Sequence, residues 1–228
     1  MDNHWMNRTV GGIVVEIPEA ARIFSQSGID YCCGGSRLLA DAILADAATD
    51  RAIDTAALEA ALDAASLRVK TSAGADDFRT LSTDALTDHI EAKHHSYLKE
   101  ALPEISERLA MVLKAHGQHH PELFQVHGVF GRIRIDLEQH LVKEEVLLFP
   151  GLTRGTPDEE TRALARTIRE EHTAVGEMLR SLRRLNHDYV APDDACPTYR
   201  RLLKEFETLE ADIFQHIHLE NNILLQGV

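Results

Sequence analysis

The chain has 228 residues, with 24 basic and 37 acidic side chains, so its formal net charge is −13. A surface this negative repels phosphate backbones, which argues against a nucleic-acid-binding protein. The sequence has no run of eighteen uncharged apolar residues and no hydrophobic signal core at its N-terminus. These features predict a cytoplasmic protein without a membrane segment.

The first part of the chain, residues 1–70, predicts a small helical domain. A short helix is expected to begin near Pro18 and to end at Gly28, because glycine readily takes the left-handed conformation that closes a helix. Ala-rich helices are expected from Ser36 and from Asp54. Residues 71–79 have the composition of a linker, and the domain boundary is expected there.

Residues 80–228 contain four segments with helical apolar periodicity, each roughly thirty residues long and joined by short connections. Antiparallel packing of such segments predicts an all-α fold, an up-down-up-down four-helix bundle. Pro103 should kink or divide the first segment, and Thr156-Pro157-Asp158-Glu159 supplies a capping box for the third. The expected helices run from Thr83 to Gly117, from Pro121 to Pro150-Gly151, from Thr156 to Asn186 and from Pro197 to Leu225.

Two of these helices carry the same pair of metal-binding residue types. His140 and Glu144 are four residues apart, and so are His216 and Glu220, whereas no other histidine is followed by glutamate at this spacing. One helical turn places such a pair on one face of the helix. Either pair alone is better explained by a surface hydrogen bond or a weak helix pair, but two pairs on separate amphipathic helices indicate a metal site.

His95 and His172 lie on the two remaining helices and complete a set of four imidazoles and two carboxylates. A carboxylate can bridge two metal ions, so this set predicts two iron or manganese ions bridged by Glu144 and Glu220. Oxo, hydroxo or an exogenous small molecule would fill the remaining positions. His94 competes with His95 for the place in the centre, because neighbouring helical residues point about 100° apart.

Other metal centres fit the sequence less well. A ferritin-like di-metal bundle needs Glu-x-x-His twice, and only Glu91 and His94 satisfy that pattern. Structural zinc prefers four ligands, often thiolates. Asp136 and Glu171 are candidates for orienting a ligand or guiding metal. The remaining histidines are expected to be solvated or to support the ligands: His89, His116, His119, His120, His127, His187 and His218.

The N-terminal domain carries adjacent cysteines, Cys32 and Cys33. Neighbouring cysteines form a disulfide only with strain, so this pair is not expected to be a structural bridge. The glycines that follow and a helix from Ser36 should place both sulfurs near amide donors and lower their pKa. Packing of two small residues in a turn is the alternative explanation. Cys196 is expected to be structural.

These residues resemble a known family. His95, His140-x-x-x-Glu144, His172 and His216-x-x-x-Glu220 resemble the hemerythrin-like superfamily, and the sequence DYCCGG at residues 30–35 resembles the N-terminal domain of the RIC (repair of iron centres) family. The resemblance implies a non-haem di-iron centre with these four histidines and two glutamates as ligands. It also implies the repair of iron–sulfur clusters damaged by nitric oxide or peroxide, through iron donation or handling of nitric oxide.

Three functions therefore compete for this chain. It can supply iron to damaged iron–sulfur proteins as a stress-response factor, with Cys32 and Cys33 as a thiol relay. It can reduce nitric oxide as an enzyme, or sense nitric oxide or oxygen as a regulatory module. The sequence has no recognisable DNA-binding, kinase or cyclase segment, which disfavours a sensor. The small cysteine domain is also a candidate homodimer contact.

Overall fold

The computed structural model describes residues 4–46, 53–71 and 78–228. In these ranges the secondary structure is helical, and the one β-type contact is an isolated bridge between Thr9 and Leu38. The all-α class predicted from the sequence is confirmed. The chain divides into two compact units, residues 87–213 with Val228, and residues 1–86 with 214–227. Within the described ranges, no helix is both long and apolar enough to cross a membrane.

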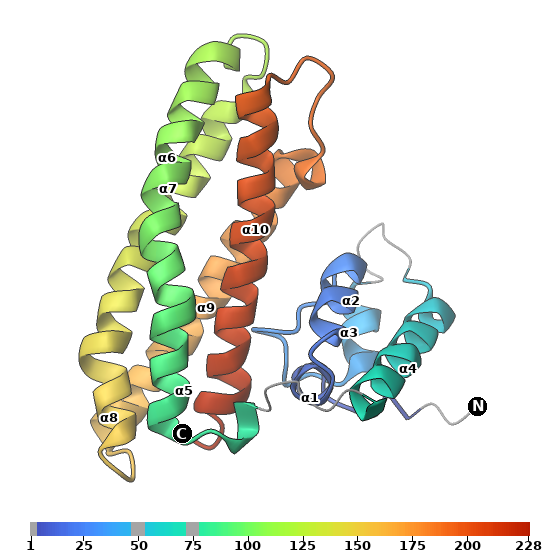
Figure 1. The fold of residues 1–228 in the computed structure, drawn as a ribbon, viewed down its shortest axis with the longest axis vertical. Helices are drawn as coiled ribbons and strands as arrows, with labels where there is room; N and C mark the ends of the chain where they lie inside the picture. The colour runs from blue at the N-terminus through green and yellow to red at the C-terminus, as the bar shows by residue number, and fades with distance from the viewer. Residues whose placement is uncertain (1–3, 47–52, 72–77) are drawn as a thin grey trace. The chain divides into compact units, whose positions relative to one another are not determined.

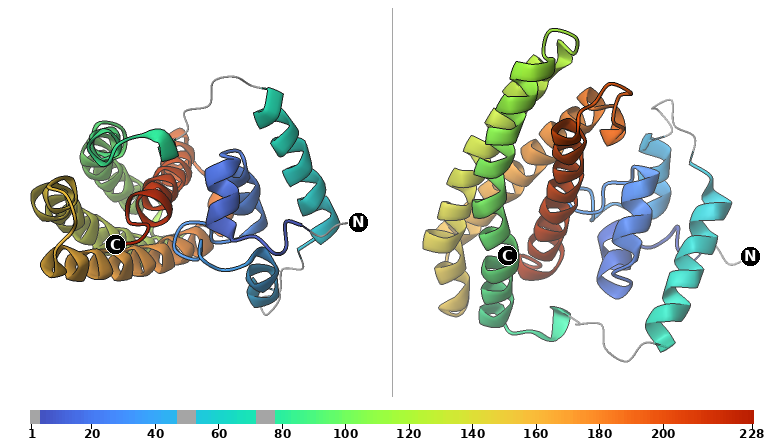
Figure 2. Two further views of the ribbon diagram at one scale, coloured as in Figure 1. Left: turned by 90° about the horizontal axis from the view of Figure 1, so that it is seen from below. Right: turned by 45° about the horizontal axis from the view of Figure 1, so that its top comes forward.

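The first unit is built from long helices that run antiparallel to their neighbours in the chain (Figure 1) and surround one interior when viewed from below (Figure 2). The rings of Phe130 and Phe206, whose centroids are 5.4 Å apart, form part of its core. The helices are α5 Thr83–Ile90, α6 Ser96–His116, α7 Glu122–Lys143, α8 Phe149–Thr153, α9 Glu159–Leu185 and α10 Pro197–Leu219.

The long helices narrow one expectation and correct two. Helix α6 continues through Pro103, so this proline does not divide it. The second helical segment passes Pro150 and ends at Thr153, because Pro150 lies in the first turn of α8, where a helix does not use that residue's amide. Helix α9 is capped by Asp158, whose side chain accepts a hydrogen bond from the amide of Thr161 at 2.8 Å.

The second unit contains four short helices and the C-terminal segment. Helix α2 ends at Gly28, which has a φ of 79°, as the sequence predicted. Helix α4 begins after Asp54, whose carboxylate accepts a hydrogen bond from the amide of Ala57 at 3.0 Å. Residues 72–77 of the predicted linker lie outside the described residues. The helices are α1 Val10–Glu16, α2 Ala20–Ser27, α3 Leu39–Asp46 and α4 Thr55–Thr71, and a 3₁₀ turn follows at Phe78–Thr80.

Helix α1 was not predicted, because its sequence VGGIVVE combines two glycines with β-branched residues, which are poor helix formers. Its N-terminus is capped by Thr9, whose hydroxyl accepts from the amide of Gly12. A Cβ atom on Gly11 would lie 2.5 Å from the side-chain oxygen of Asn222. Close packing of α1 on the C-terminal segment therefore requires glycine at position 11.

Candidate metal centre

Three turns of π-helix interrupt the long helices, and each contains a residue predicted to bind metal. The turn Glu91–His95 ends at His95, the turn Glu144–Leu148 begins at Glu144, and the turn Glu220–Leu224 begins at Glu220. A π-helical turn contains one extra residue and changes the direction of the side chains that follow. Such turns occur often at functional sites, and the sequence periodicity did not reveal them.

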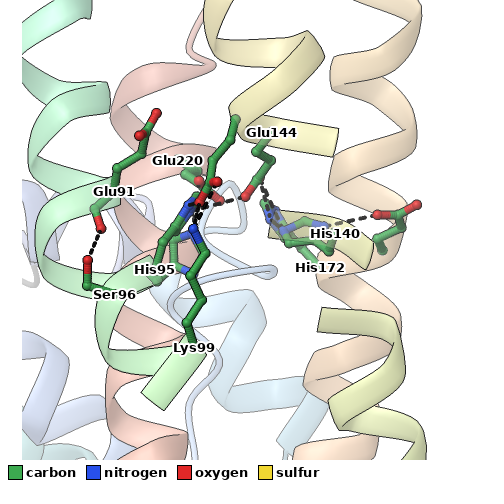
Figure 3. A network of polar contacts seen from close by, with 11 residues as sticks. Glu91, His95, Ser96, Lys99, His140, Glu144, His172 and Glu220 are labelled. Atoms are coloured by element: carbon green, nitrogen blue, oxygen red, sulfur yellow. Dashed lines mark hydrogen bonds and ion pairs between the residues drawn. The ribbon is translucent and has the colours of Figure 1, made fainter. Parts of the chain in front are cut away.

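The carboxylate of Glu144 lies between imidazoles from three helical segments (Figure 3). Its Oε2 atom is 3.4 Å from Nε2 of His95, whereas Oε1 is 3.2 Å from Nε2 of His140 and 3.8 Å from Nε2 of His172. The Nε2 atoms of His140 and His172 are 3.1 Å apart. The two oxygens of one buried carboxylate thus face different histidines, as in a carboxylate that bridges two cations.

Outer carboxylates orient two of these imidazoles. Nδ1 of His95 lies 2.8 Å from Glu145, and Nδ1 of His140 lies 2.9 Å from Glu171. When these imidazoles are neutral, the contacts place the N–H on Nδ1 and the lone pair on Nε2, the nitrogen that faces Glu144. Lys99 pairs with Glu145 at 2.7 Å and holds that carboxylate in place. Lys143 pairs with Glu171 in the same way.

The C-terminal part of helix α10 and the π-turn after it supply the last predicted pair. Nε2 of His216 is 2.9 Å from Oε1 of Glu220, and both residues have no exposed surface. Among the described residues, two groups each bring their ligand atoms within 4.8 Å of one another, and both groups contain Glu144 and Glu220. The first group is His95, Glu144, His216 and Glu220, and the second is His140, Glu144, His172 and Glu220.

Burial and charge act against each other in this centre. Burial disfavours a charged carboxylate, but His140, His172 and His95 together hold the pKa of Glu144 well below its usual range. Burial also disfavours the imidazolium of His140, but the carboxylates of Glu144 and Glu171 outweigh it and raise its pKa to about 9. The centre thus attracts positive charge, whether as protons or as a metal cation.

The structure decides between residues that the sequence left open. Nδ1 of His94 lies 2.9 Å from Asp212, whereas His95 faces Glu144, so His95 is the member of the histidine pair that lies in the centre. Asp136 is exposed, and Glu171 is the carboxylate that contacts His140. His94 and His218 are buried, with 4 % and 2 % exposure, so neither is solvated. Reasoning from the sequence missed Glu145, because no spacing rule distinguishes it from its neighbour Glu144.

Replacing Glu171 with alanine is expected to weaken iron binding by about 10–100-fold, because His140 loses the acceptor that fixes its ring. Competition for ferrous iron with a chromophoric chelator measures the change. Glu170→Ala is the matched control, since that neighbouring side chain is exposed. Equal iron affinities for the two variants would show that Glu171 does not orient His140.

The cysteine turn of the N-terminal unit is held by Asp30, whose Oδ1 accepts hydrogen bonds from the amides of Cys32 at 3.1 Å and Cys33 at 3.0 Å. The two sulfurs are 3.6 Å apart, and both cysteines are thiols. A Cβ atom on Gly34 would lie 2.9 Å from the carbonyl oxygen of Asp30, and one on Gly35 would lie 2.7 Å from that of Tyr31. The tightness of this turn therefore explains the two glycines after the cysteines.

The expected low pKa is wrong for Cys32. The hydrogen bond with Cys33, burial and the carboxylate of Asp30 raise the pKa of Cys32 well above its usual range. The amides that were expected to stabilise a thiolate are directed at Asp30 instead. Helix α3 begins at Leu39 and not at Ser36, where the sequence predicted it to begin.

The cysteine turn contacts the C-terminal segment within the same unit. The side chains of Asn221 and Asn222 donate to the carbonyl oxygen of Cys32 at 3.3 and 3.4 Å, and Asn222 also donates to that of Tyr31 at 3.3 Å. The ring of Tyr31 packs against His218, with centroids 5.8 Å apart. Asn221 and Asn222 directly follow Glu220, so the turn that carries the thiols is tied to the backbone next to a residue of the metal centre.

Residues 86–227, which contain all six residues of the two His/Glu groups, match the family model of the hemerythrin HHE cation binding domain. The chain belongs to the hemerythrin family. Residues 6–66, which include the cysteine turn, match a domain of unknown function (DUF542). The buried histidines and glutamates of this hemerythrin domain are able to hold a metal.

Curated relatives match this hemerythrin-family chain over nearly its whole length. The iron–sulfur cluster repair protein YtfE of Dickeya chrysanthemi is 31% identical over 97% of this chain and 96% of its own length. YtfE of Yersinia pseudotuberculosis is 31% identical over 96% of both chains. The iron–sulfur cluster repair protein ScdA of Staphylococcus haemolyticus is 29% identical over 94% of this chain and 95% of its own. The predicted resemblance to the repair family is confirmed.

Proposed function

We propose that this chain is a cytoplasmic di-iron protein that repairs iron–sulfur clusters damaged by nitrosative or oxidative stress. The observation that carries the proposal is the pair of His/Glu groups that share Glu144 and Glu220 in a chain aligned end to end with iron–sulfur cluster repair proteins. A single ion bound by one of these groups would not require carboxylates that also belong to the other group. Two groups that share two carboxylates fit two ions at bridging distance, roughly 3.5–4 Å.

In this proposal, Glu144 and Glu220 would be shared by two non-haem iron ions. His95 and His216 would hold one ion, and His140 and His172 would hold the other, following the two groups. The donor set suits iron, since imidazole and carboxylate bind ferrous and ferric ions and the centre contains no thiolate. All six residues are at most 2 % exposed, so the chain shields the ions from water and from chance chelators.

Bound iron can be passed to a cluster that has lost iron, or it can take up the nitric oxide that damages clusters. The chain's own residues set the conditions for this exchange. Glu145 and Glu171 keep the Nε2 atoms of His95 and His140 directed inward. Glu144 and Glu220 belong to both groups, so they are the residues that we expect to control the release of iron.

Cys32 and Cys33 are proposed to receive iron or nitrosyl groups at the end of this route. Their turn is tied through Asn221 and Asn222 to the backbone beside Glu220, which supports a shared task. Three donors, from Asp30, Cys32 and Cys33, lie within 4.8 Å of one another and are able to accept a cation. Because the pKa of Cys32 is raised, an incoming cation must displace its proton, and this thiol stays protonated until then.

The double variant Cys32→Ala, Cys33→Ala is expected to keep its full iron content and to repair clusters at least about 10-fold more slowly. The iron content is unaffected because neither residue belongs to the two His/Glu groups. The rate is measured as recovery of activity in a damaged [4Fe–4S] enzyme. Cys196→Ala is the control, and a double variant that repairs at the rate of this control would remove the thiols from the proposal.

Repair itself is tested with a [4Fe–4S] hydratase inactivated by nitric oxide. Addition of the iron-loaded chain under anaerobic conditions, with thiol reductant and a source of sulfide, should restore activity faster than an equal amount of free ferrous iron. Iron analysis of the two proteins after separation should show transfer to the hydratase. Restoration no faster than free iron would contradict the proposed function, and steady consumption of nitric oxide without transfer of iron would support a reductase instead.

A further inference from the structure

A second group of metal-binding side chains lies at the other end of helix α6. His116 is the last residue of α6, His120 lies just before α7, and Asp194 lies in the connection between α9 and α10. Their ligand atoms lie within 4.8 Å of one another. Nε2 of His120 is 3.0 Å from both carboxylate oxygens of Asp194. Two ligands of one zinc ion are separated by a similar distance, roughly 3.4 Å for tetrahedral binding.

The backbone and a buried ring fix the positions of the two imidazoles. The amide of His120 donates to the carbonyl oxygen of His116 at 2.9 Å, which sets the turn that brings the two side chains together. The ring of Tyr199, only 4 % exposed, contacts both imidazoles, with centroid distances of 5.4 Å to His116 and 5.7 Å to His120. The histidines are therefore placed by the fold and do not depend on their interaction with Asp194.

The contact between His120 and Glu122 matches the arrangement that supports metal-binding histidines. Nδ1 of His120 lies 3.1 Å from Oε1 of Glu122, while Nε2 faces Asp194. A histidine that binds metal through one nitrogen commonly donates its other N–H to a carboxylate, which fixes the tautomer and makes the ligand more basic. Glu122 thus has the same relation to His120 that Glu171 has to His140.

Cys196 follows Asp194 by two residues, but it does not belong to the group whose ligand atoms lie within 4.8 Å of one another. The expectation that Cys196 is structural therefore stays a prediction. The donors that the fold brings together here are two imidazoles and one carboxylate.

We propose that His116, His120 and Asp194 form a second metal site that binds a divalent ion of the zinc type. Two imidazoles and one carboxylate suit a tetrahedral zinc ion whose fourth position is open to water, whereas the His/Glu groups together have six donors. The sites are distinct, because α6 separates His95 from His116 by roughly 30 Å along its axis. The inference does not depend on the proposed repair activity.

Zinc titration of the full-length, iron-loaded chain against a chromophoric zinc chelator tests the site. One zinc per chain should bind while the iron content stays constant. The double variant His116→Ala, His120→Ala should lower the zinc affinity by more than about 10-fold. Loss of a residue that only orients a metal ligand already lowers metal affinity by about 10-fold or more, and this variant removes two ligands. The control is the double variant His119→Ala, His127→Ala, which also removes two histidines, both exposed, and should bind zinc unchanged.

Several outcomes would overturn the proposal. They are the absence of zinc binding, zinc uptake with an equal loss of iron, and equal zinc affinities for the two double variants. Any of these would leave His120 and Asp194 as a simple ion pair.

Discussion

Replacing Glu144 with glutamine is expected to reduce the iron content from the two ions per chain that we propose to one or none. Glutamine keeps the size of the side chain but has a single oxygen, so it cannot face His95 with one oxygen and His140 with the other. It also removes the negative charge that offsets two cations in a buried site. Colorimetric iron analysis and Mössbauer spectroscopy of anaerobically purified protein measure the result.

Glu138→Gln is the matched control for this variant, because Glu138 lies on the same helix, α7, and its contact with Arg134 is on the surface. Far-UV circular dichroism should show the same helix content for both variants. A Glu144→Gln protein with two ions and an unchanged Mössbauer spectrum would contradict the bridging role. Loss of iron from both variants would indicate damage to the bundle and no specific role for Glu144.

Replacing Arg183 with methionine is expected to lower the free energy of unfolding by about 3 kcal/mol, because it leaves a buried carboxylate without its cation. Nε of Arg183, on α9, lies 3.2 and 3.0 Å from the two oxygens of Glu210, on α10, and the side chain of Glu210 is only 3 % exposed. The guanidinium also covers the ring of Tyr189, 4.8 Å from its centroid. Urea denaturation of the iron-free protein measures the change.

The pH dependence of this destabilisation follows from the same carboxylate. Burial raises the pKa of Glu210 even beside the guanidinium, and loss of Arg183 will raise it further. A raised pKa in the folded state means that folding favours the protonated form, so the unfolding free energy of the variant falls as the pH rises through that pKa. The destabilisation should therefore be larger at alkaline pH than at mildly acidic pH.

Two further variants test the cause. Arg184→Met changes the neighbouring exposed arginine and should alter stability by no more than about 0.5 kcal/mol. The double variant Arg183→Met, Glu210→Leu should regain most of the lost stability, because it removes both charges. A loss below about 1 kcal/mol for Arg183→Met alone would show that Glu210 has another adequate partner.

Local patterns were enough to predict the ends of several helices. Gly28 ends α2 in a left-handed conformation, Asp54 caps α4, and α10 begins at Pro197, all from signals within one turn of the boundary. The third long helix was expected to open with a capping box that starts at Thr156, but the side chain of Asp158 makes the capping hydrogen bond.

The π-turns at the metal centre had no such local signal. A π-turn is less stable than an α-turn in isolation, so it persists where burial of particular side chains outweighs the distortion. In this chain, those side chains include His95 and Glu144, both with no exposed surface. The periodicity of a sequence reports the regular helix and cannot show where packing makes the helix depart from it.

The sequence by itself determined the helical class, the repeated His-x-x-x-Glu spacing and the choice of donors, because each follows from residue types within one or two turns. Only the tertiary structure decided that His95 and not His94 faces Glu144, that Glu145 and Glu171 orient the imidazoles, and that Cys32 stays protonated. The physical reason is that direction, burial and charge at a site depend on neighbours from other helices, whose approach no local pattern records.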